Sequence, residues 1–353
     1  MSETWLVVGE IAVWVAAAGC LWLIAVNRWA MNWTDGPLKT ATFVGGFLLL
    51  VGAAVWLGSA HRSSRWTVVP FAVLGLVVVG EVRRAVLCRG LRGEAPVSVN
   101  PPARNGWRPV TTTDLAVIRH RVMVPGLRGD RLRVVQLSDL HVTDQLPYDY
   151  YVGALETAAR QQPDLLFLTG DFVSTRRRVD LVEGLLARRL SARLGVFGVL
   201  GNHDFWTDSS AVRRVLERLG VHLLSGQCHR LTLSGGATVQ LCGTERPWGV
   251  RLDAEAVSEA DLTLVLSHNP DNVYELASLG ATAVFGGHYH GGQFRIPGLG
   301  AFVVPSRYGR RFDRGRFRIA RTDLFVSSGV GVDMPALRIY CRPDILVVDF
   351  VGG

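Results

Sequence analysis

The chain has 353 residues, a formal net charge of +8 and five cysteines. This length exceeds that of one typical domain, and the apolar residues gather near the start, so we expect at least two physically different parts. Arginine carries almost all of the positive charge, because Lys39 is the only lysine. The cysteines form no C-x-x-C pair, which argues against a disulfide scaffold and a zinc–thiolate site. We expect Cys228, Cys242 and Cys341 to be small buried residues.

Three apolar stretches, at 5–29, 41–60 and 66–87, occupy the first 88 residues, together with seven of the ten tryptophans. The first two have about the 20 residues that a helix needs to span a bilayer, so they are predicted to be transmembrane helices. The third contains Pro70 and Glu81. It either spans the membrane, with its arginines snorkelling to the interface, or lies re-entrant or along the surface. Residues 1–88 are therefore predicted to be a multi-pass membrane region in contact with lipid.

The side of the membrane is predicted from the basic residues that flank these stretches. With three spans and an outer N-terminus, six basic residues lie inside and two outside. The positive-inside rule then places the rest of the chain in the cytoplasm. The inner residues are Arg28, Lys39, Arg83, Arg84, Arg89 and Arg92, and the outer residues are Arg62 and Arg65.

Residues 89–110 are rich in proline, glycine and asparagine and lack periodicity, which predicts a linker before a domain at 111–353. In that domain, short apolar runs typical of buried strands alternate with helical patterns. This order predicts an α/β fold, a two-sheet β-sandwich flanked by helices. The predicted strands are 132–137, 165–168, 196–200, 238–242, 262–266, 283–285, 324–327 and 345–350, and the predicted helices are 150–160, 179–193 and 209–219.

Polar clusters directly follow five of the predicted strands. They offer carboxylates, an amide oxygen and imidazoles without thiolates, a set that suits two divalent ions such as Mn, Fe or Zn. Neighbouring glycines, including Gly201 and Gly287, allow the backbone to approach the site closely. One carboxylate, such as that of Asp171, can bridge two ions about 3.5–4 Å apart. The candidate residues are Asp139, His141, Asp171, Asn202, His203, Asp204, His268, His288 and His290.

In sequence and order, these clusters resemble the D-x-H, G-D, G-N-H-D/E, H and G-H-x-H motifs of the calcineurin-like metallophosphoesterase superfamily. The resemblance covers residues 132–350. The stretches V-L-G-N-H-D-F-W, L-S-H-N-P-D and G-G-H-Y-H-G-G-Q are similar to the bacterial membrane-associated branch, whose members are phosphodiesterases or phosphatases of the cell envelope.

The resemblance implies a role for each candidate. His203 would contact the phosphate and stabilise or protonate the leaving oxygen, with Asp204 orienting it. Many members have an acidic residue three positions after the bridging aspartate, where this chain has Ser174. One ion would be held by Asp139, His141 and His290, the other by Asn202, His268 and His288, and Asp171 would bridge them.

These features predict a membrane-anchored phosphoesterase in which a metal-bridging hydroxide attacks phosphorus in line. Tethering at the bilayer favours lipid-linked or cell-envelope phosphodiesters as substrates. One alternative is a cytoplasmic-facing nucleotide or nucleic-acid phosphodiesterase, and another is a non-catalytic membrane-bound regulatory or binding module. Nucleic acid is not expected as a partner, because a membrane-tethered enzyme meets little of it. The arginine-rich and aromatic segment 307–318 is consistent with a head-group or membrane contact, with nucleic-acid binding or with a solvated hairpin.

Overall fold

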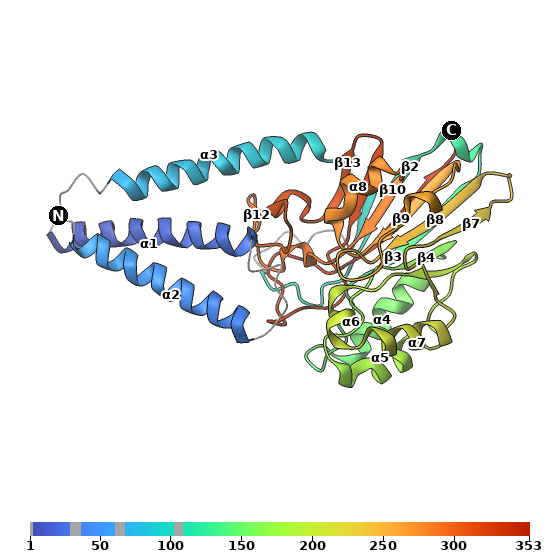
Figure 1. Ribbon diagram of the computed structural model, residues 1–353, viewed down its shortest axis with the longest axis horizontal. Coiled ribbons are helices and arrows are strands. Elements are labelled where there is room, and N and C mark those ends of the chain that lie inside the picture. Colours follow the sequence, from blue (N-terminus) through green and yellow to red (C-terminus); the bar gives the residue numbers. More distant parts are fainter. Residues whose placement is uncertain (1–2, 29–36, 61–67, 102–108) are drawn as a thin grey trace. The chain divides into compact units, whose positions relative to one another are not determined.

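The computed structural model describes residues 3–28, 37–60, 68–101 and 109–353 (Figure 1). The chain divides into two compact units, a helical unit of Met1–Leu91 with Phe302–Arg311 and a sheet unit of Arg92–Ala301 with Phe312–Gly353. The helices are α1 (Glu3–Arg28), α2 (Pro37–Ala60), α3 (Val68–Leu91), α4 (Tyr148–Ala159), α5 (Val179–Leu186), α6 (Asn202–Thr207), α7 (Ser209–Arg218) and α8 (Val273–Ser278).

Two helices of the helical unit, α1 and α2, are long and apolar enough to cross a membrane, over Thr4–Val26 and Ala41–Ser59. They approach closely at Gly58, where an added Cβ would lie 2.9 Å from Cα of Ile11. Small residues allow such contacts between membrane helices. Among the described residues only these two helices reach this length and hydropathy, so the crossing of the third apolar stretch stays a prediction.

The third apolar stretch forms one continuous helix, α3, with Pro70 in its first turn, where proline is tolerated. Glu81, in the middle of α3, forms ion pairs with Arg84 and with Arg310 of the segment that joins this unit. The pairs offset the cost of a carboxylate on a largely apolar helix.

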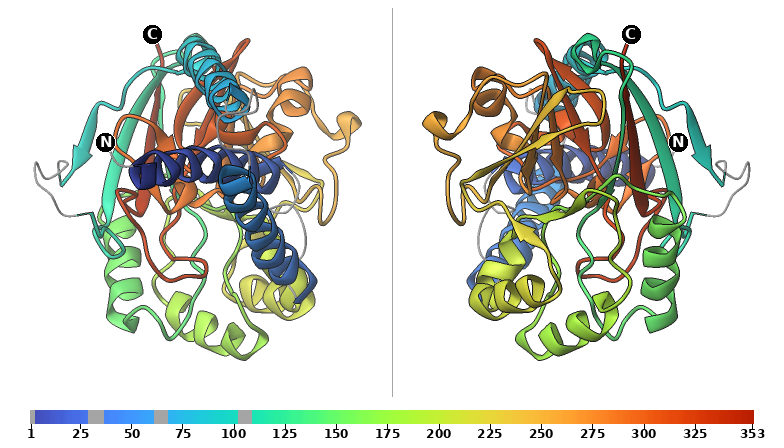
Figure 2. Two further views of the ribbon diagram at one scale, coloured as in Figure 1. Left: turned by 90° about the vertical axis from the view of Figure 1, so that its left-hand side faces the viewer. Right: turned by 90° about the vertical axis from the view of Figure 1, so that its right-hand side faces the viewer.

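The sheet unit contains two sheets that pack face to face (Figure 2). The first has the strand order β1-β2-β15-β3-β4-β5-β6, the second has the order β13-β14-β10-β9-β8-β7, and β11 pairs with β12 in a small hairpin. The strands are β1 (Ser98–Asn100), β2 (Ala116–Met123), β3 (Arg131–Leu137), β4 (Leu165–Leu168), β5 (Gly195–Gly198), β6 (His222–Leu223), β7 (Cys228–Thr232), β8 (Thr238–Thr244), β9 (Leu262–Ser267), β10 (Ala283–Gly286), β11 (Arg295–Ile296), β12 (Gly300–Ala301), β13 (Gly315–Ile319), β14 (Thr322–Val326) and β15 (Asp344–Val351).

Two apolar layers hold the sandwich together. Between the sheets, Phe167 of β4 packs edge-on against Phe285 of β10, with ring centroids 5.0 Å apart. On the other face of the first sheet, α4, α5 and α7 bury residues such as Tyr151 and Leu216. Strands β3, β4 and β5 are parallel, as are β8, β9, β10 and β14. The loops after these strands therefore gather at one edge of each sheet.

The predicted α/β sandwich is confirmed, with differences at particular elements. The helix predicted over 179–193 ends at Leu186, because Ala187 is extended and Arg188 is left-handed with φ of 62°. Strand β2 was not predicted, since its arginines and His120 interrupt the apolar pattern. The predicted linker 89–110 contains the end of α3 and β1, and its residues 102–108 lie outside the described part. The domain boundaries stay a prediction.

Of the cysteines expected to be small buried residues, Cys242 is buried and Cys228 is only half-buried, and a disulfide that was not predicted joins them. Cys228 of β7 lies directly opposite Cys242 of β8 in the antiparallel register, and the two form a disulfide. Fourteen residues separate them in the sequence, so spacing alone gave no indication that the strands would align them. Cys341 is free and buried, as expected.

Candidate metal centre

The predicted ligands meet at the edge where the parallel strands end. Asp139 follows β3, Asp171 follows β4 and His268 follows β9 of the other sheet. His141 and His290, 149 residues apart in the chain, come to lie with their Nε2 atoms 3.0 Å from each other. The two sheets thus bring together polar loops that are far apart in the sequence.

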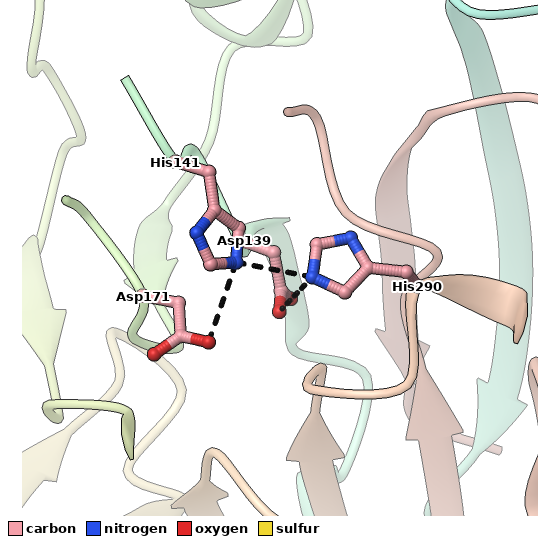
Figure 3. Close-up of side chains that lie close together, drawn as sticks. All are labelled: Asp139, His141, Asp171 and His290. Atoms are coloured by element: carbon pink, nitrogen blue, oxygen red, sulfur yellow. Dashed lines mark hydrogen bonds and ion pairs between the residues drawn. The ribbon is translucent and has the colours of Figure 1, made fainter. Parts of the chain in front are cut away.

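Two groups of buried side chains have ligand atoms within 4.8 Å of one another, close enough to hold metal ions. Figure 3 shows that the members of the first group point toward one another. One aspartate belongs to both groups. The first group is Asp139, His141, Asp171 and His290, and the second is Asp171, His268 and His288.

The carboxylate of Asp171 lies between imidazoles of the two groups. Its Oδ2 is 3.4 Å from Nε2 of His141 and 3.1 Å from Nε2 of His268. Asn202 adds an amide oxygen to the second group, because its Oδ1 lies 3.1 Å from the same nitrogen of His268. Nitrogen and oxygen lone pairs that converge in this way fit divalent cations of the Mn, Fe or Zn type.

The backbone of these loops is held in an unusual conformation. Residues other than glycine avoid positive φ, and such strain collects at functional sites. Here it occurs at five of the seven predicted ligands, which turns consecutive loops inward to the same point. The φ values are 50° at Asp139, 41° at His141, 56° at Asp171, 66° at His288 and 49° at His290.

Two glycines allow neighbouring loops to lie against the carboxylates. A Cβ at Gly201 would lie 2.3 Å from Oδ1 of Asp171. A Cβ at Gly287 would lie 2.1 Å from Oδ2 of Asp139 and 1.9 Å from Oγ of Ser138. All three distances are shorter than any contact a side chain tolerates, so the close approach predicted for these glycines is confirmed.

Hydrogen bonds fix the orientation of two imidazoles. Nδ1 of His268 donates to the carbonyl of Thr169 at 2.7 Å, which leaves Nε2 facing Asp171. Nδ1 of His141 lies 2.8 Å from Oγ of Ser174. Ser174, at which the sequence departs from the family pattern, therefore supports the His141 ring.

The protonation of the histidines suits ligands of a cation. Burial lowers the pKa of His288 and His290 well below the usual range, so both rings are neutral, the form that binds a metal ion. Burial also disfavours a charged His268, but the carboxylate of Asp171 outweighs it and raises the pKa of His268 to about 9. A bound cation would displace that proton.

His203 stands apart from the predicted ligands because its side chain is only half-buried. Its ring centroid lies 4.6 Å from that of His141. Its backbone N–H donates to Oδ1 of Asp171 at 2.8 Å. His203 therefore lies against the centre while part of its ring reaches the surface, as a group that meets a substrate should.

Asp204 is buried and supports the loop that carries Asp171. Its carboxylate accepts hydrogen bonds from the backbone N–H groups of Asp171 and Phe172 at 2.8 and 2.9 Å, and from that of Gly201 at 2.9 Å. These bonds make Asp204 a positioning residue for the Asp171 loop. Its predicted role in orienting His203 stays a prediction.

The sequence analysis missed Arg338, whose side chain is fully buried beside the centre. Its guanidinium lies 3.3 Å from Nδ1 of His290 and donates to the carbonyl of Ser328 at 2.7 Å. It also donates to the carbonyl of His290 at 3.2 Å. Arg338 thus links the His290 loop to the loop after β14, and no local motif signals this role.

A cleft of about 670 Å³ begins beside His141. Val142, Ser174 and Val332 line it near the centre, and Arg178 and Met334 line it farther out. Its size suits an organic substituent on a phosphate.

A two-sheet α/β sandwich with two ligand groups that share a carboxylate defines a metal-dependent hydrolase. Residues 132–292 match the calcineurin-like phosphoesterase family. The chain therefore carries a calcineurin-like metallophosphoesterase domain and is an enzyme, and we refer to its sheet unit as the catalytic unit.

Several bacterial proteins are similar to the chain. It is 27% identical to the uncharacterized metallophosphoesterase YkuE of Bacillus subtilis, over 62% of this chain and 78% of that protein. It is 27% identical to phosphodiesterase YaeI of Escherichia coli, over 67% of this chain and 88% of that protein. Its identity to UDP-2,3-diacylglucosamine pyrophosphatase LpxG of Chlamydia trachomatis is also 27%, over 47% of this chain and 65% of that protein.

The shared position of Asp171 predicts how metal content responds to substitution. Asp171→Ala should lose more bound metal than His141→Ala or His268→Ala, because each imidazole belongs to one group only. Elemental analysis of the purified full-length protein measures this loss. Asp180→Ala, which removes an exposed carboxylate from α5, should keep the wild-type metal content. Retention of both ions by Asp171→Ala would show that Asp171 does not bridge them.

Proposed function

We propose that this protein is a membrane-anchored phosphoesterase that hydrolyses phosphodiesters of lipid-linked or cell-envelope substrates. One observation carries the chemical part of the proposal: Asp171 belongs to two buried groups of metal-ligating side chains. A shared carboxylate is how two-metal hydrolases hold their ions together. We assign Asp139, His141 and His290 to one ion, and Asn202, His268 and His288 to the other.

Different residues of the chain have different roles in the reaction. Two bound cations would supply charge neutralisation for the phosphate oxygens and a water molecule with a lowered pKa. The carboxylate of Asp171 and the amide of Asn202 supply oxygen ligands. Asp204 fixes the Asp171 loop by accepting hydrogen bonds from its backbone N–H groups. His203 lies at the open side of the centre, where its imidazole can stabilise or protonate the leaving oxygen.

The substrate class rests on the membrane helices and on the relatives. Helices α1 and α2 meet the length and hydropathy of membrane spans, which supports an enzyme tethered at the bilayer. YaeI is a phosphodiesterase by name, and LpxG is named for a substrate with two acyl groups and a diphosphate. A lipid-linked phosphodiester or diphosphate is therefore the favoured substrate. Its rival is a nucleotide without a lipid.

The first test measures metal and hydrolysis together. The full-length enzyme should bind two divalent ions per chain, and removal of the ions by a chelator should abolish hydrolysis of an aryl phosphodiester. Among natural compounds, lipid-linked diesters should be cleaved faster than free nucleotides. A fully active enzyme with at most one ion per chain would refute the two-ion site. Faster cleavage of free nucleotides would refute the substrate class.

The second test separates a catalytic histidine from a ligand. His203→Ala should keep both ions and lose about 10²–10³ in turnover, the typical cost of removing one charge-stabilising or proton-donating group. The loss should be smaller for substrates with an acidic leaving group, which needs little proton donation. Metal content and a rate series over leaving groups provide the measurement.

Two results would contradict this role for His203. A metal content that falls in step with activity would make His203 a ligand. An equal loss of turnover for good and poor leaving groups would restrict it to binding the phosphate.

Two features predict opposite sides of the membrane for the catalytic unit. The basic residues beside the apolar stretches predict the cytoplasm. The disulfide between Cys228 and Cys242 opposes this orientation, because disulfides persist in oxidising compartments and are rare in the cytosol. The bond lies within the catalytic unit itself, so we give it the greater weight. We propose that the catalytic unit faces an oxidising compartment, where it would meet envelope substrates directly.

Thiol counting tests this orientation. Protein from cells quenched with acid and denatured without reductant should react with maleimide at three cysteines, Cys20, Cys88 and Cys341, and at five after reduction. Cys228→Ser should raise the unreduced count by one, because it frees Cys242. An alkaline phosphatase fused after Gly353 should be active. Five reactive thiols without reductant and an inactive fusion would place the unit in the cytoplasm.

A further inference from the structure

Two tryptophans that the catalytic mechanism does not use lie against the histidines of the centre. The ring of Trp206, in α6, has its centroid 5.0 Å from that of His203. The ring of Trp248 lies 4.9 Å from His288 and 5.9 Å from His268. One tryptophan therefore adjoins the histidine that would meet the phosphate, and the other adjoins two ligands of the second ion.

The two tryptophans come from adjoining parts of the chain. Phe205, next to Trp206, packs so closely on Gly249, next to Trp248, that a Cβ at Gly249 would lie 2.2 Å from its ring. Helix α6 therefore packs on the segment that follows β8, and the indoles of these two adjoining segments lie against His203 and His288. The cleft beside His141 has a different lining, of Val142, Ser174 and Arg178 among others.

Partial exposure distinguishes these rings from ordinary core residues. Trp206 and Trp248 are both half-buried, while the ligand histidines behind them are buried. An indole that only shielded the ligands would gain most from complete burial, since apolar area removed from water is what stabilises it. Two large aromatic surfaces left partly open beside a phosphate site are suited to stacking against a ligand.

We infer that Trp206 and Trp248 form a subsite that binds a nucleobase carried by the phosphoester. Nucleobases present flat π-faces, and stacking of such a face on an aromatic side chain contributes to binding with little dependence on base identity. The inference rests on the proposed function and deepens it, because it specifies a nucleoside on one side of the cleaved phosphate. On the other side, the cleft beside His141 remains for the second substituent, which the proposed function takes to be lipid-linked.

Binding of product-like ligands to the metal-loaded full-length protein tests the inference. Uridine 5′-phosphate and ribose 5-phosphate share the phosphate and the sugar, and only the first has a base. Titration calorimetry should show tighter binding of uridine 5′-phosphate. Trp206→Ala or Trp248→Ala should weaken its binding by roughly 5- to 150-fold, the range of stacking contributions per base, and leave ribose 5-phosphate unchanged.

Two further variants serve as controls. Trp248→Phe keeps an aromatic face and should retain most of the preference for uridine 5′-phosphate. Val250→Ala trims an exposed apolar side chain in the same segment, one that lies against Gly226, and it should change neither ligand's binding.

The outcomes separate this inference from the proposed function. An equal loss of binding for both phosphates in the alanine variants would show that the tryptophans only support the ligand histidines. Equal affinity of the wild-type protein for the two phosphates would show that no base is recognised. Either result overturns the inference alone, provided that inorganic phosphate binds and both metal ions are present. Failure of the metal or phosphate to bind would instead refute the proposed function.

Discussion

The buried carboxylate of Asp171 and the imidazoles on either side of it are the interaction on which the rest of the centre depends. A charged carboxylate without compensation is very costly in a protein interior. His141 and His268 lie 3.4 and 3.1 Å from it, the backbone N–H of His203 donates to it, and bound cations would add the largest favourable charge. Each of these partners comes from a different loop, so the site depends on the sheets that bring these loops together.

The two-sheet architecture supplies these loops. In the first sheet β3, β4 and β5 run parallel, and in the second β9 and β10 do, so the polar clusters at their carboxyl ends meet along one edge. Glycines at 201 and 287 allow the loops to approach closely. Asp204 and Arg338 stabilise the loops through hydrogen bonds to their backbone groups. The left-handed ligand residues store strain that this bonding offsets.

The reaction and the substrate depend on different parts of the catalytic unit. In the proposed function, the metal ligands and His203 set the chemistry. The surroundings of the centre include tryptophans beside His203 and His288 and, beside His141, a cleft lined by polar, aliphatic and arginine side chains. Because a fold does not determine a substrate, these surroundings carry whatever specificity the enzyme has.

The sequence by itself determined the reaction class, the α/β sandwich and the set of candidate ligands, because each ligand directly follows an apolar run and the order of the motifs is informative. It also predicted the two helices that are long and apolar enough to cross a membrane. Tertiary structure alone decided that Cys228 faces Cys242, since register between strands depends on pairing and not on spacing. It likewise placed the guanidinium of Arg338 beside the ring of His290, and the carboxylate of Asp204 within hydrogen-bonding distance of backbone N–H groups. Contacts between residues far apart in the chain are set by how the sheets pack, and no local pattern records that packing.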